Sequence, residues 1–375
     1  MTEIYLIRHT QAEGNLYRMM QGHWDGGVTA LGWKEIDALA ERFREIPVDA
    51  VYASDLSRAR LTASALTRYT GQTVIPRPGL REVDLGTWEA QFFANLAHAY
   101  PRDMENFIQR PDKWKVEGAE TYADVQKRAM AELYALAEAH PGQRIAAVSH
   151  GVTIRCIIAA VTGVALENIG SLAIYRNTSV SRLTYENGLF TAHELDDVSH
   201  LDHLNLTHWR KGTDIRDKIL DPEKDRDFYC TCYAKSWLAA HGSLEGFDPI
   251  PYLSRAITHH KTNENAVLKL FLGDEPVGLL DMDTARGAEE GAGWISLIYV
   301  KEEYRRQGFG MQTLARALRL YSSLGRDRLM LHVADENAAA LEFYRSCGFE
   351  FVRSEHNSLG ELLTMERSLG GRRYV

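Results

Sequence analysis

Two histidines follow strand-like runs in the first half of the chain. Arg8-His9 comes directly after the apolar residues 4–7, and Ser149-His150-Gly151 comes at the end of the nearly all-apolar run 145–149. Because the carboxyl ends of parallel strands meet at one edge of a sheet, we expect both histidines to face the same crevice. The pattern therefore predicts a single site that contains two imidazoles and at least one guanidinium.

Arg58 and Glu82 add the other groups that such a site needs. Arg58 follows a strand predicted over residues 51–53 and lies in the first turn of a helix, where its charge opposes the helix dipole. An anion bound by both the helix N-terminus and the guanidinium removes this conflict. Neutral imidazole is nucleophilic, and arginines offset the charge of a transferring phosphoryl group. The leaving alcohol needs a proton, and Glu82, kept protonated by neighbouring acidic oxygens, is the candidate donor. These residues predict phosphoryl transfer through a covalent phosphohistidine.

A glycine-bearing turn in the second half predicts a different anion site. The turn Arg305-Arg306-Gln307-Gly308-Phe309-Gly310 lies between a strand predicted over residues 294–300 and a helix predicted over 311–321. Backbone N–H groups at such a turn cradle an anion, and the glycines allow a pyrophosphate to approach. A P-loop is excluded because no Gly-Lys-Ser/Thr follows, and a Rossmann fingerprint because the third glycine and the later acidic residue are missing.

The elements that must position these groups differ between the halves. Strand-like runs alternate with amphipathic helices over the first two hundred residues, which is typical of an α/β fold with a mostly parallel sheet. The second half has its own strand–helix order, and the chain has no internal repeats. The predicted strands span residues 4–7, 51–53, 145–149, 267–272, 277–281, 294–300 and 328–333. The predicted helices begin after Thr29, at residue 57 and after a capping box at Thr121, and span 228–240, 311–321 and 337–346.

A polar segment between His193 and Lys211 separates the two patterns. We place the domain boundary there and expect domains at residues 1–203 and 204–375. His200 and His203 have the spacing of a metal pair, but no carboxylate or cysteine spacing completes a coordination set, so we expect solvated linker histidines and no metal.

Composition narrows the classes of partner. The 375 residues carry a formal net charge of −8, which argues against a nucleic-acid partner. Four cysteines without CxxC spacing indicate reduced thiols. No signal peptide precedes the first strand, and no apolar stretch approaches the ~20 residues that span a bilayer. We therefore expect a soluble, cytoplasmic protein that has no membrane partner, and the oligomeric state is left open.

The N-terminal residues together resemble the histidine phosphatase superfamily, which includes the phosphoglycerate mutases. The resemblance implies a three-layer α/β/α fold with a mostly parallel sheet, and the family order is intact over about 200 residues. Thr10 departs from the glycine that many members have after the histidine, and it is also small. The matching segments are Leu6-Ile7-Arg8-His9-Thr10, Asn15, Gln21-Gly22, Thr29-x-x-Gly32, Ser54-x-Leu56-x-Arg58-Ala59-x-x-Thr62-Ala63, Glu82, Gly86-x-Trp88-Glu89 and Val148-Ser149-His150-Gly151.

The resemblance also implies a role for each matching site residue. His9 is the phosphoryl acceptor and Glu82 the proton donor, while the phosphate is bound by Arg8, Arg58 and His150 with help from Asn15 and the backbone at Gly151. Mutases of the family usually carry longer insertions around the pocket. Because the lid expected over residues 89–121 is short, we favour hydrolysis of a small-molecule phosphoester. The aromatic residues of this lid are Phe92, Phe93, Tyr100, Phe107 and Trp114.

The second half resembles the GNAT acetyltransferases over roughly residues 204–375, which implies an α+β fold with a mixed sheet. The turn ending in Gly308-Phe309-Gly310 is followed by Asn337-Ala338, by Phe343-Tyr344 and by Cys347-Gly348-Phe349. The resemblance implies acetyl-CoA as co-substrate, Tyr344 as hydrogen-bond donor to the departing thiolate, and an amine as acceptor. The implied cofactor-binding residues are Ile298, Val300, Arg305, Arg306, Gln307, Gly308, Phe309, Gly310, Met311 and Asn337. The general base stays open among Asp281, Asp283, Glu302 and Glu303.

The sequence thus predicts a bifunctional enzyme, a phosphatase joined to an N-acetyltransferase. One alternative makes the second half an acetyl-CoA sensor that regulates the phosphatase by binding alone. A second alternative makes the first half a mutase.

Overall fold

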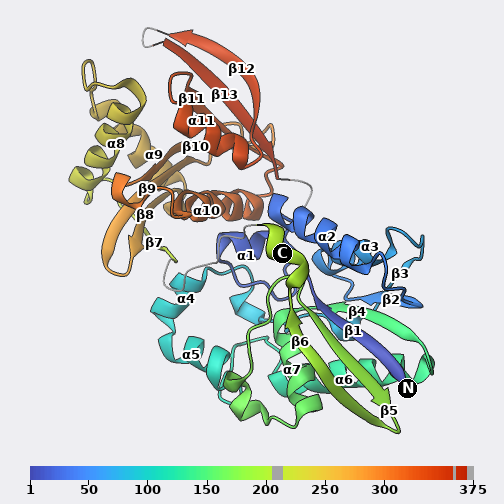
Figure 1. Ribbon diagram of the computed structural model, residues 1–375. Coiled ribbons are helices and arrows are strands. Elements are labelled where there is room, and N and C mark those ends of the chain that lie inside the picture. Colours follow the sequence, from blue (N-terminus) through green and yellow to red (C-terminus); the bar gives the residue numbers. More distant parts are fainter. Residues whose placement is uncertain (205–213, 358–359, 370–375) are drawn as a thin grey trace. The chain divides into compact units, whose positions relative to one another are not determined.

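The computed structural model describes residues 1–204, 214–357 and 360–369. The chain divides into two compact units, Met1–Trp209 and Arg210–Val375. The boundary predicted after residue 203 adjoins residues 205–213, which lie outside the described part of the chain. Each unit contains one sheet with helices packed on it, and the two sheets have different topologies (Figure 1).

Six strands form the sheet of the N-terminal unit within residues 1–204, in the order β3-β2-β4-β1-β5-β6. β1 to β4 run parallel to one another, and β5 and β6 are antiparallel additions at one edge. The predicted mostly parallel sheet is therefore confirmed. The strands are β1 Thr2–Arg8, β2 Ala50–Ala53, β3 Val74–Pro76, β4 Arg144–Ser149, β5 Val180–Glu186 and β6 Leu189–Asp197.

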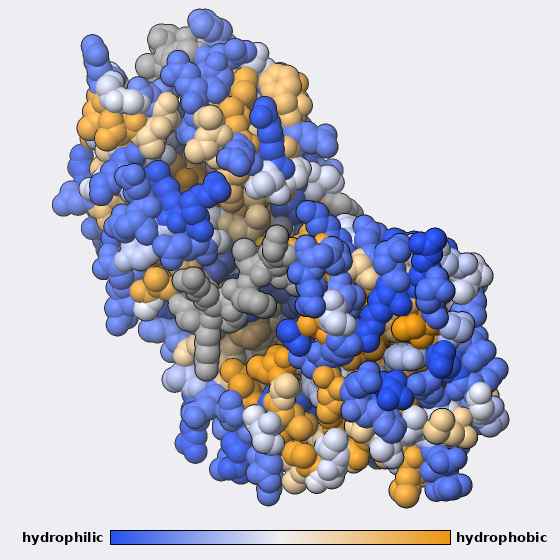
Figure 2. Space-filling model, viewed as in Figure 1, coloured by the Kyte–Doolittle hydropathy of each residue, from blue (hydrophilic) through white to orange (hydrophobic). Residues whose placement is uncertain are grey.

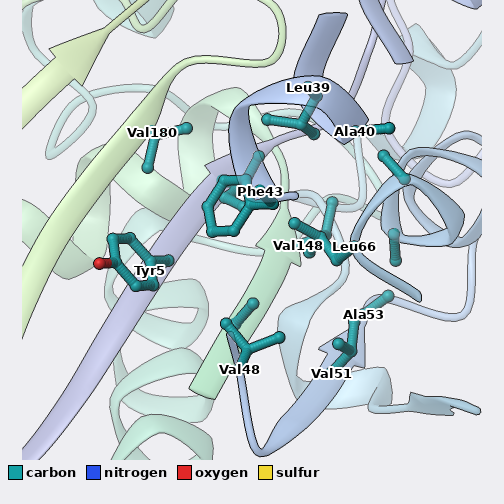
Figure 3. Close-up of a cluster of buried hydrophobic side chains, with 14 of the residues drawn as sticks. Tyr5, Leu39, Ala40, Phe43, Val48, Val51, Ala53, Leu66, Val148 and Val180 are labelled. Atoms are coloured by element: carbon teal, nitrogen blue, oxygen red, sulfur yellow. The ribbon is translucent and has the colours of Figure 1, made fainter. Parts of the chain in front are cut away.

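Helices cover both faces of this sheet and give the predicted three layers (Figure 1). On one face the apolar sides of α2 and α3 pack on the strands; Figure 3 shows Phe43 and Leu66 against Val51 and Val148. On the other face α6 and α7 pack through residues such as Leu133. The helices are α1 Glu13–Tyr17, α2 Ala30–Phe43, α3 Ser57–Thr67, α4 Phe93–Ala99, α5 Pro101–Gln109, α6 Tyr122–Ala139 and α7 Gly151–Thr162.

The start of the predicted polar linker is part of this unit. Residues from His193 to Asp197 belong to β6, whose residues are mostly exposed because it is the edge strand. His200 is not a solvated linker residue: its Nδ1 lies 3.4 Å from Arg42 and its Nε2 3.2 Å from the Thr178 hydroxyl. Burial, followed by the charge of Arg42, lowers the pKa of His200 to about 4.

Seven strands form a mixed sheet in the C-terminal unit within the described residues, in the order β12-β13-β11-β10-β9-β8-β7. β10 and β11 are parallel, and the other neighbours are antiparallel. The mixed sheet that the sequence predicts is confirmed. The strands are β7 Arg216–Ile219, β8 Val267–Leu272, β9 Glu275–Asp283, β10 Ala292–Val300, β11 Arg328–Ala334, β12 Glu350–Asn357 and β13 Gly360–Ser368.

Helices also cover this second sheet. Tyr229 of α8 and Leu253 of α9 pack with Leu297 of β10, whereas Phe309 at the start of α10 packs with Val277 of β9 in a separate cluster. Both clusters include residues from the second half of β10, the strand that precedes the glycine-bearing turn, since Val300 packs against the second cluster. The helices are α8 Arg226–His241, α9 Ile250–Thr262, α10 Phe309–Ser323 and α11 Ala338–Ser346.

The face shown in Figure 2 is mainly hydrophilic, with apolar side chains exposed in small groups. No helix in the described part of the chain is long and apolar enough to cross a membrane. Across residues 1–204, 214–357 and 360–369, no group of three or more His, Cys, Asp or Glu side chains is arranged to hold a metal ion.

Candidate active sites

His9 and His150 meet at the carboxyl ends of neighbouring strands. β1 and β4 pair in parallel with Arg8 opposite Ser149, so the next residue of each strand leaves the sheet at the same level. The centroids of the two imidazole rings lie 5.1 Å apart, and both side chains are buried. The structure therefore brings together the two histidines that the sequence singled out.

The hydrogen bonding of His9 defines which ring nitrogen is reactive. Nδ1 lies 2.7 Å from the carbonyl oxygen of Thr10, which can only accept, so we assign the proton to Nδ1 and the lone pair to Nε2. Burial, and then the charges of Arg58 and Arg8, lower the pKa of His9 well below its ordinary value. His9 is thus a neutral imidazole with Nε2 available as a nucleophile.

Arg8 and Arg58 supply positive charge beside the two rings. Arg8 donates to the Tyr175 carbonyl, while Arg58 donates to the carbonyl of Gly22 at 2.7 Å and pairs with Asp25 at 3.3 Å. Burial lowers the pKa of both guanidinium groups, although arginine stays charged in proteins. The Nε–H of each arginine is buried without an acceptor in the described residues, which is the condition that a bound phosphate oxygen would relieve.

His150, Gly151 and Asn15 differ in what they can offer a ligand. Neither ring nitrogen of His150 has a hydrogen-bond partner among the described residues, and burial together with Arg58 lowers its pKa. Gly151 begins α7, and its own backbone N–H is left for an anion, whereas those of Val152 and Thr153 donate to Glu82. The Asn15 side-chain oxygen accepts from the backbone N–H of Ala12 at 3.0 Å, so this oxygen caps α1 and leaves the amide NH₂ for a ligand.

Glu82 lies at the N-terminus of α7. The acidic oxygens expected around it include those of the substrate phosphate; within the protein, the Glu82 carboxylate accepts from the backbone N–H groups of Val152 and Thr153, both at 3.1 Å. The Thr153 hydroxyl lies 3.2 Å from the same group, while its proton is donated to the Arg81 carbonyl at 2.7 Å. The N-terminus of α7 thus holds the Glu82 carboxyl group against Val152 and Thr153, the second and third residues after His150.

Gln21 is a polar residue that sequence reasoning passed over. Its side-chain oxygen and nitrogen are buried and have no partner among the described residues. A Cβ at Gly14 would lie 1.9 Å from the Gln21 amide oxygen, so the glycine makes room for this side chain. The carbonyl of the next residue, Gly22, binds Arg58. The only signal in the sequence was the Gln21-Gly22 segment within the longer motif.

Aromatic residues of the expected lid pack into a hydrophobic cluster that also includes residues of α6 and α7. Trp114 and Phe92 are buried, and the Phe107 ring centroid lies 5.1 Å from that of Trp114, whereas Tyr100 is 52% exposed. Only two short helices, α4 and α5, lie between residues 89 and 121. This segment is therefore a small packed layer.

The parallel pairing of β10 and β11 in the C-terminal unit ends early. Pairs run from Ala292 and Arg328 to Ile295 and Leu331, and no pair follows within the described residues. The pairing of β10 with β9 is irregular between Ile295 and Leu297 and then continues to Val300. The backbone of β10 beyond Ile295, including Ile298, is therefore unpaired on the β11 side and can bind an extended ligand.

The glycine-bearing turn leads from this unpaired edge into α10. Gly308 is the N-cap with φ 85°, a left-handed conformation that favours glycine, and Arg306 has φ 60°. Phe309 is a buried core residue, so it offers a ligand only its backbone N–H. Gly310 packs near an aromatic ring, since a Cβ there would lie 3.2 Å from Phe343. The first turn of α10 therefore presents backbone N–H groups to an anion.

The remaining side chains of the turn mostly bond to their own surroundings. Arg305 Nε donates to the Val300 carbonyl at 3.1 Å, and Gln307 donates to the Glu303 carbonyl at 3.1 Å. Arg306 is exposed. Met311 contacts the Cys347 sulfur at 3.7 Å through its own sulfur.

Tyr344 and Asn337 lie on α11 and at its start. The Tyr344 ring packs against Phe343 and Phe349, and burial raises the pKa of its hydroxyl, which therefore stays protonated and able to donate. The Asn337 side-chain oxygen accepts from the backbone N–H of Ala340 at 3.1 Å, so Asn337 caps the helix and only its NH₂ group is left for a ligand.

Comparison with known proteins assigns each unit to a family. Residues 4–198, about half of the chain, match the histidine phosphatase superfamily (branch 1). The chain belongs to the histidine phosphatase superfamily. Residues 226–349 match the acetyltransferase (GNAT) family. The chain therefore joins a histidine phosphatase domain to a GNAT domain, as the sequence predicted.

Individual relatives cover the histidine phosphatase domain. The probable phosphoglycerate mutase GpmB of Klebsiella pneumoniae subsp. pneumoniae is 29% identical over 207 residues, which span 54% of this chain and 96% of the relative. The solved structure of YhfR from Bacillus stearothermophilus is 29% identical with a TM-score of 0.52, over 54% of this chain and 100% of that one. A mycobacterial glucosyl-3-phosphoglycerate phosphatase is 26% identical with a TM-score of 0.49, over 52% of this chain and 98% of that one.

The four candidate bases of the GNAT domain differ in accessibility. Asp281 is buried, with one oxygen on His259 Nδ1 and the other on the Tyr229 hydroxyl, both at 2.7 Å. Glu302 and Glu303 follow Val300, which itself lies about 17 Å along the strand from Ile295, where β10 and β11 separate. Asp283 is partly exposed, lies opposite Trp294 next to that point, and pairs with His259 at 3.4 Å.

Proposed function

We propose that the N-terminal domain hydrolyses small-molecule phosphomonoesters through a phosphohistidine at His9. The observation that carries this proposal is the buried cluster in which the rings of His9 and His150 lie 5.1 Å apart beside Arg8 and Arg58. A phosphate between them gives acceptors to the arginine Nε–H groups and the His150 ring, which otherwise have none in the described residues. Membership of the histidine phosphatase superfamily supports the same chemistry.

The reaction uses His9 and Glu82 twice. Nε2 of His9 attacks phosphorus, the bond from phosphorus to the alcohol oxygen breaks, and Glu82 in its acid form gives its proton to the leaving oxygen. The Glu82 carboxylate then takes a proton from a water molecule as that water attacks the phosphohistidine. Inorganic phosphate and neutral His9 result, while Arg8 and Arg58 offset the charge on the phosphoryl oxygens in both steps.

Hydrolysis and mutase chemistry differ in what attacks the phosphohistidine. The Klebsiella relative is named a probable phosphoglycerate mutase, and a mutase must return the phosphoryl group to an alcohol rather than to water. The short helices α4 and α5 support access of water, so we favour hydrolysis. For a phosphatase, we expect release of inorganic phosphate without a bisphosphorylated primer. Transfer of the phosphoryl group from one hydroxyl to another, seen only when such a primer is added, would instead establish a mutase.

The test of the phosphatase is the phosphoenzyme itself. A radiolabelled phosphomonoester should leave an acid-labile, base-stable label on the wild-type chain, and His9→Ala should lose both the label and turnover. His193→Ala is the matched control, because that histidine is exposed and its ring forms a hydrogen bond with Thr184 on the neighbouring strand, away from His9 in the sequence. Excess chelator should change neither result. Retained turnover in His9→Ala would refute the assignment.

The C-terminal domain is proposed to transfer the acetyl group of acetyl-CoA to a small-molecule or protein amine. Support comes from the unpaired edge of β10, the N-terminus of α10 at Gly308, and the match to the GNAT family. The pyrophosphate is expected at the α10 turn, the pantetheine arm along Ile298 and Val300, and the thiol near Tyr344. The amine attacks the acetyl carbonyl directly, and the Tyr344 hydroxyl donates to the thiolate that leaves.

Tyr344→Phe separates this enzyme from an acetyl-CoA sensor. The hydroxyl matters when negative charge develops on sulfur, so the variant should bind acetyl-CoA like the wild type but transfer acetyl groups more slowly. Calorimetric titration measures the binding, and single-turnover transfer to amines from a screened panel measures the rate. Tight binding with no acetylated amine in the wild type would favour the sensor instead.

A further inference from the structure

A single arginine of α6 holds the loop that carries Glu82. Arg128 Nη1 donates to the carbonyl oxygens of Gly79 at 3.0 Å and Arg81 at 2.7 Å. Arg128 Nη2 donates to the carbonyl oxygen of Glu82 at 2.8 Å. One guanidinium thus binds three carbonyls within residues 79–82, a segment that has only a short 3-10 helix, Pro78–Leu80, to define its backbone.

Glu120 fixes the guanidinium in this position. Its two carboxylate oxygens accept from Arg128 Nε and Nη2, each at 2.8 Å, and one of them also accepts from the backbone N–H of Asp84 at 3.0 Å. Burial raises the pKa of Glu120, but the hydrogen bonds from Arg128 and Asp84 outweigh burial and lower it, so the carboxylate stays charged. The five N–H groups of Arg128 are matched by five hydrogen bonds, which leaves none for the substrate phosphate.

The loop is therefore held from two sides at Glu82. Its backbone carbonyl is bound by Arg128 and also lies 2.9 Å from Nε2 of His23, and its carboxylate is bound by the N–H groups of Val152 and Thr153 at the start of α7. The Thr153 hydroxyl also lies 2.7 Å from the Arg81 carbonyl, so α6 and α7 share an anchor on the loop. A shift of the backbone at Glu82 would pull the carboxyl group away from these donors and away from a leaving oxygen.

We infer that Arg128, fixed by Glu120, is a positioning residue for proton transfer by Glu82. The inference rests on the proposed role of Glu82 as the proton donor. Arg128 does not touch the reacting atoms; it sets the distance over which the Glu82 proton moves to the oxygen that leaves phosphorus. A misplacement of about 1 Å in such a group costs a reaction about 100-fold in rate.

The experiment compares two substrates in the same protein preparation. p-Nitrophenyl phosphate has a leaving group that departs without help from an acid, whereas 2-phenylethyl phosphate releases a strongly basic alkoxide that needs the proton. Dividing kcat/KM for the alkyl ester by kcat/KM for the aryl ester cancels the fraction of folded enzyme. We expect Arg128→Met to lower this ratio about tenfold or more, and Arg128→Lys, which keeps the charge but not the five N–H groups, to lower it less.

Arg155→Met is the matched control. Arg155 of α7 is also buried and also binds backbone carbonyls, those of Ile108, Ile169 and Leu172, but none in residues 79–84. Its loss should reduce both kcat/KM values together and leave their ratio unchanged. In a Glu82→Gln background, Arg128→Met should lower the ratio by less than about twofold, because the proton donor is already absent.

The outcomes separate this inference from the function on which it rests. A wild-type chain with no His9-dependent turnover overturns the proposed function and the inference together. His9-dependent turnover with an unchanged ratio in Arg128→Met overturns the inference alone. The inference is also overturned if Arg128→Met lowers the ratio as much in the Glu82→Gln background as in the wild type. Arg128 would then act through a group other than Glu82.

Discussion

The imidazole rings of His9 and His150 lie 5.1 Å apart with an angle of 51° between their planes, at the ends of two neighbouring parallel strands. Burial and the charge of Arg58 lower the pKa of both rings, so the pocket holds two neutral imidazoles beside two guanidinium groups. A phosphate dianion matches this pocket in charge and in hydrogen bonding, because it brings only acceptors. One ring can then attack phosphorus while the other donates to a phosphoryl oxygen.

Because the pKa of His9 is lowered, we expect the phosphatase to stay active at mildly acidic pH. The reactive form is neutral, and its pKa in the folded protein lies well below the ordinary 6.5, so activity is lost only as the pH falls through the lowered value. We expect kcat/KM, which reports the free enzyme, to have its acid limb below pH 6.5 after correction for ionisation of the substrate. An acid limb at or above 6.5 would contradict the neutral nucleophile.

Glu82→Gln should slow alkyl phosphates far more than p-nitrophenyl phosphate. The reason is that the amide cannot give a proton to the leaving oxygen, and general acids contribute about 10²–10⁴-fold when the leaving group is strongly basic. The amide NH₂ would also face the N–H of Val152 or Thr153, so part of any loss is structural. Comparing the two substrates removes that part. Equal losses for both would give Glu82 a different role.

Gly308→Val should weaken acetyl-CoA binding. The side chain would enter the turn before α10, and the left-handed φ of 85° costs a branched residue about 1–2 kcal/mol. Gly325→Val controls for the backbone effect, because Gly325 has φ 70° and open space around its Cβ but lies after the end of α10. We expect a similar loss of stability in both variants and a loss of binding in Gly308→Val alone, as measured by calorimetric titration. Equal binding by Gly308→Val and the wild type would mean that the cofactor site is elsewhere.

Because of His259, we expect the GNAT domain to become less stable as the pH is raised into the alkaline range. Its ring nitrogens lie 2.7 Å from Asp281 and 3.4 Å from Asp283; burial lowers the pKa of His259, but these hydrogen bonds outweigh burial and raise it to about 9. Because the folded value exceeds the unfolded 6.5, the stabilisation is complete below 6.5 and is lost as the pH rises through 9.

Denaturation of the wild type and of His259→Gln measures this contribution. The difference between their free energies of unfolding should shrink by about 2–3 kcal/mol from about pH 6 to about pH 10. In the full chain, the unfolding transition of the GNAT domain is the one that changes its midpoint in His259→Gln. A difference that does not change with pH would show that His259 is not charged in the folded protein.

Local sequence was sufficient for the parts of the fold whose pattern is self-contained. The buried parallel strands β1, β2 and β4 each contain a continuous apolar run, and the capping box at Thr121 marks the start of α6, so each could be recognised from its own residues. The edge strand β6 could not, because most of its residues face solvent and it exists only by pairing with β5. Residues 193–197 therefore looked like a linker.

The residue types and their order along the chain determined the chemistry of both sites: a histidine after each of two strands, an arginine at a helix start, and a glycine turn after a third strand. Only the tertiary structure decided how these groups are held. The N–H groups around Glu82, the clamp of Arg128 and Glu120, and the point where β10 and β11 separate all join segments far apart in the chain. Burial and hydrogen bonding depend on such long-range contacts, and these leave no local pattern of residues from which they could be predicted.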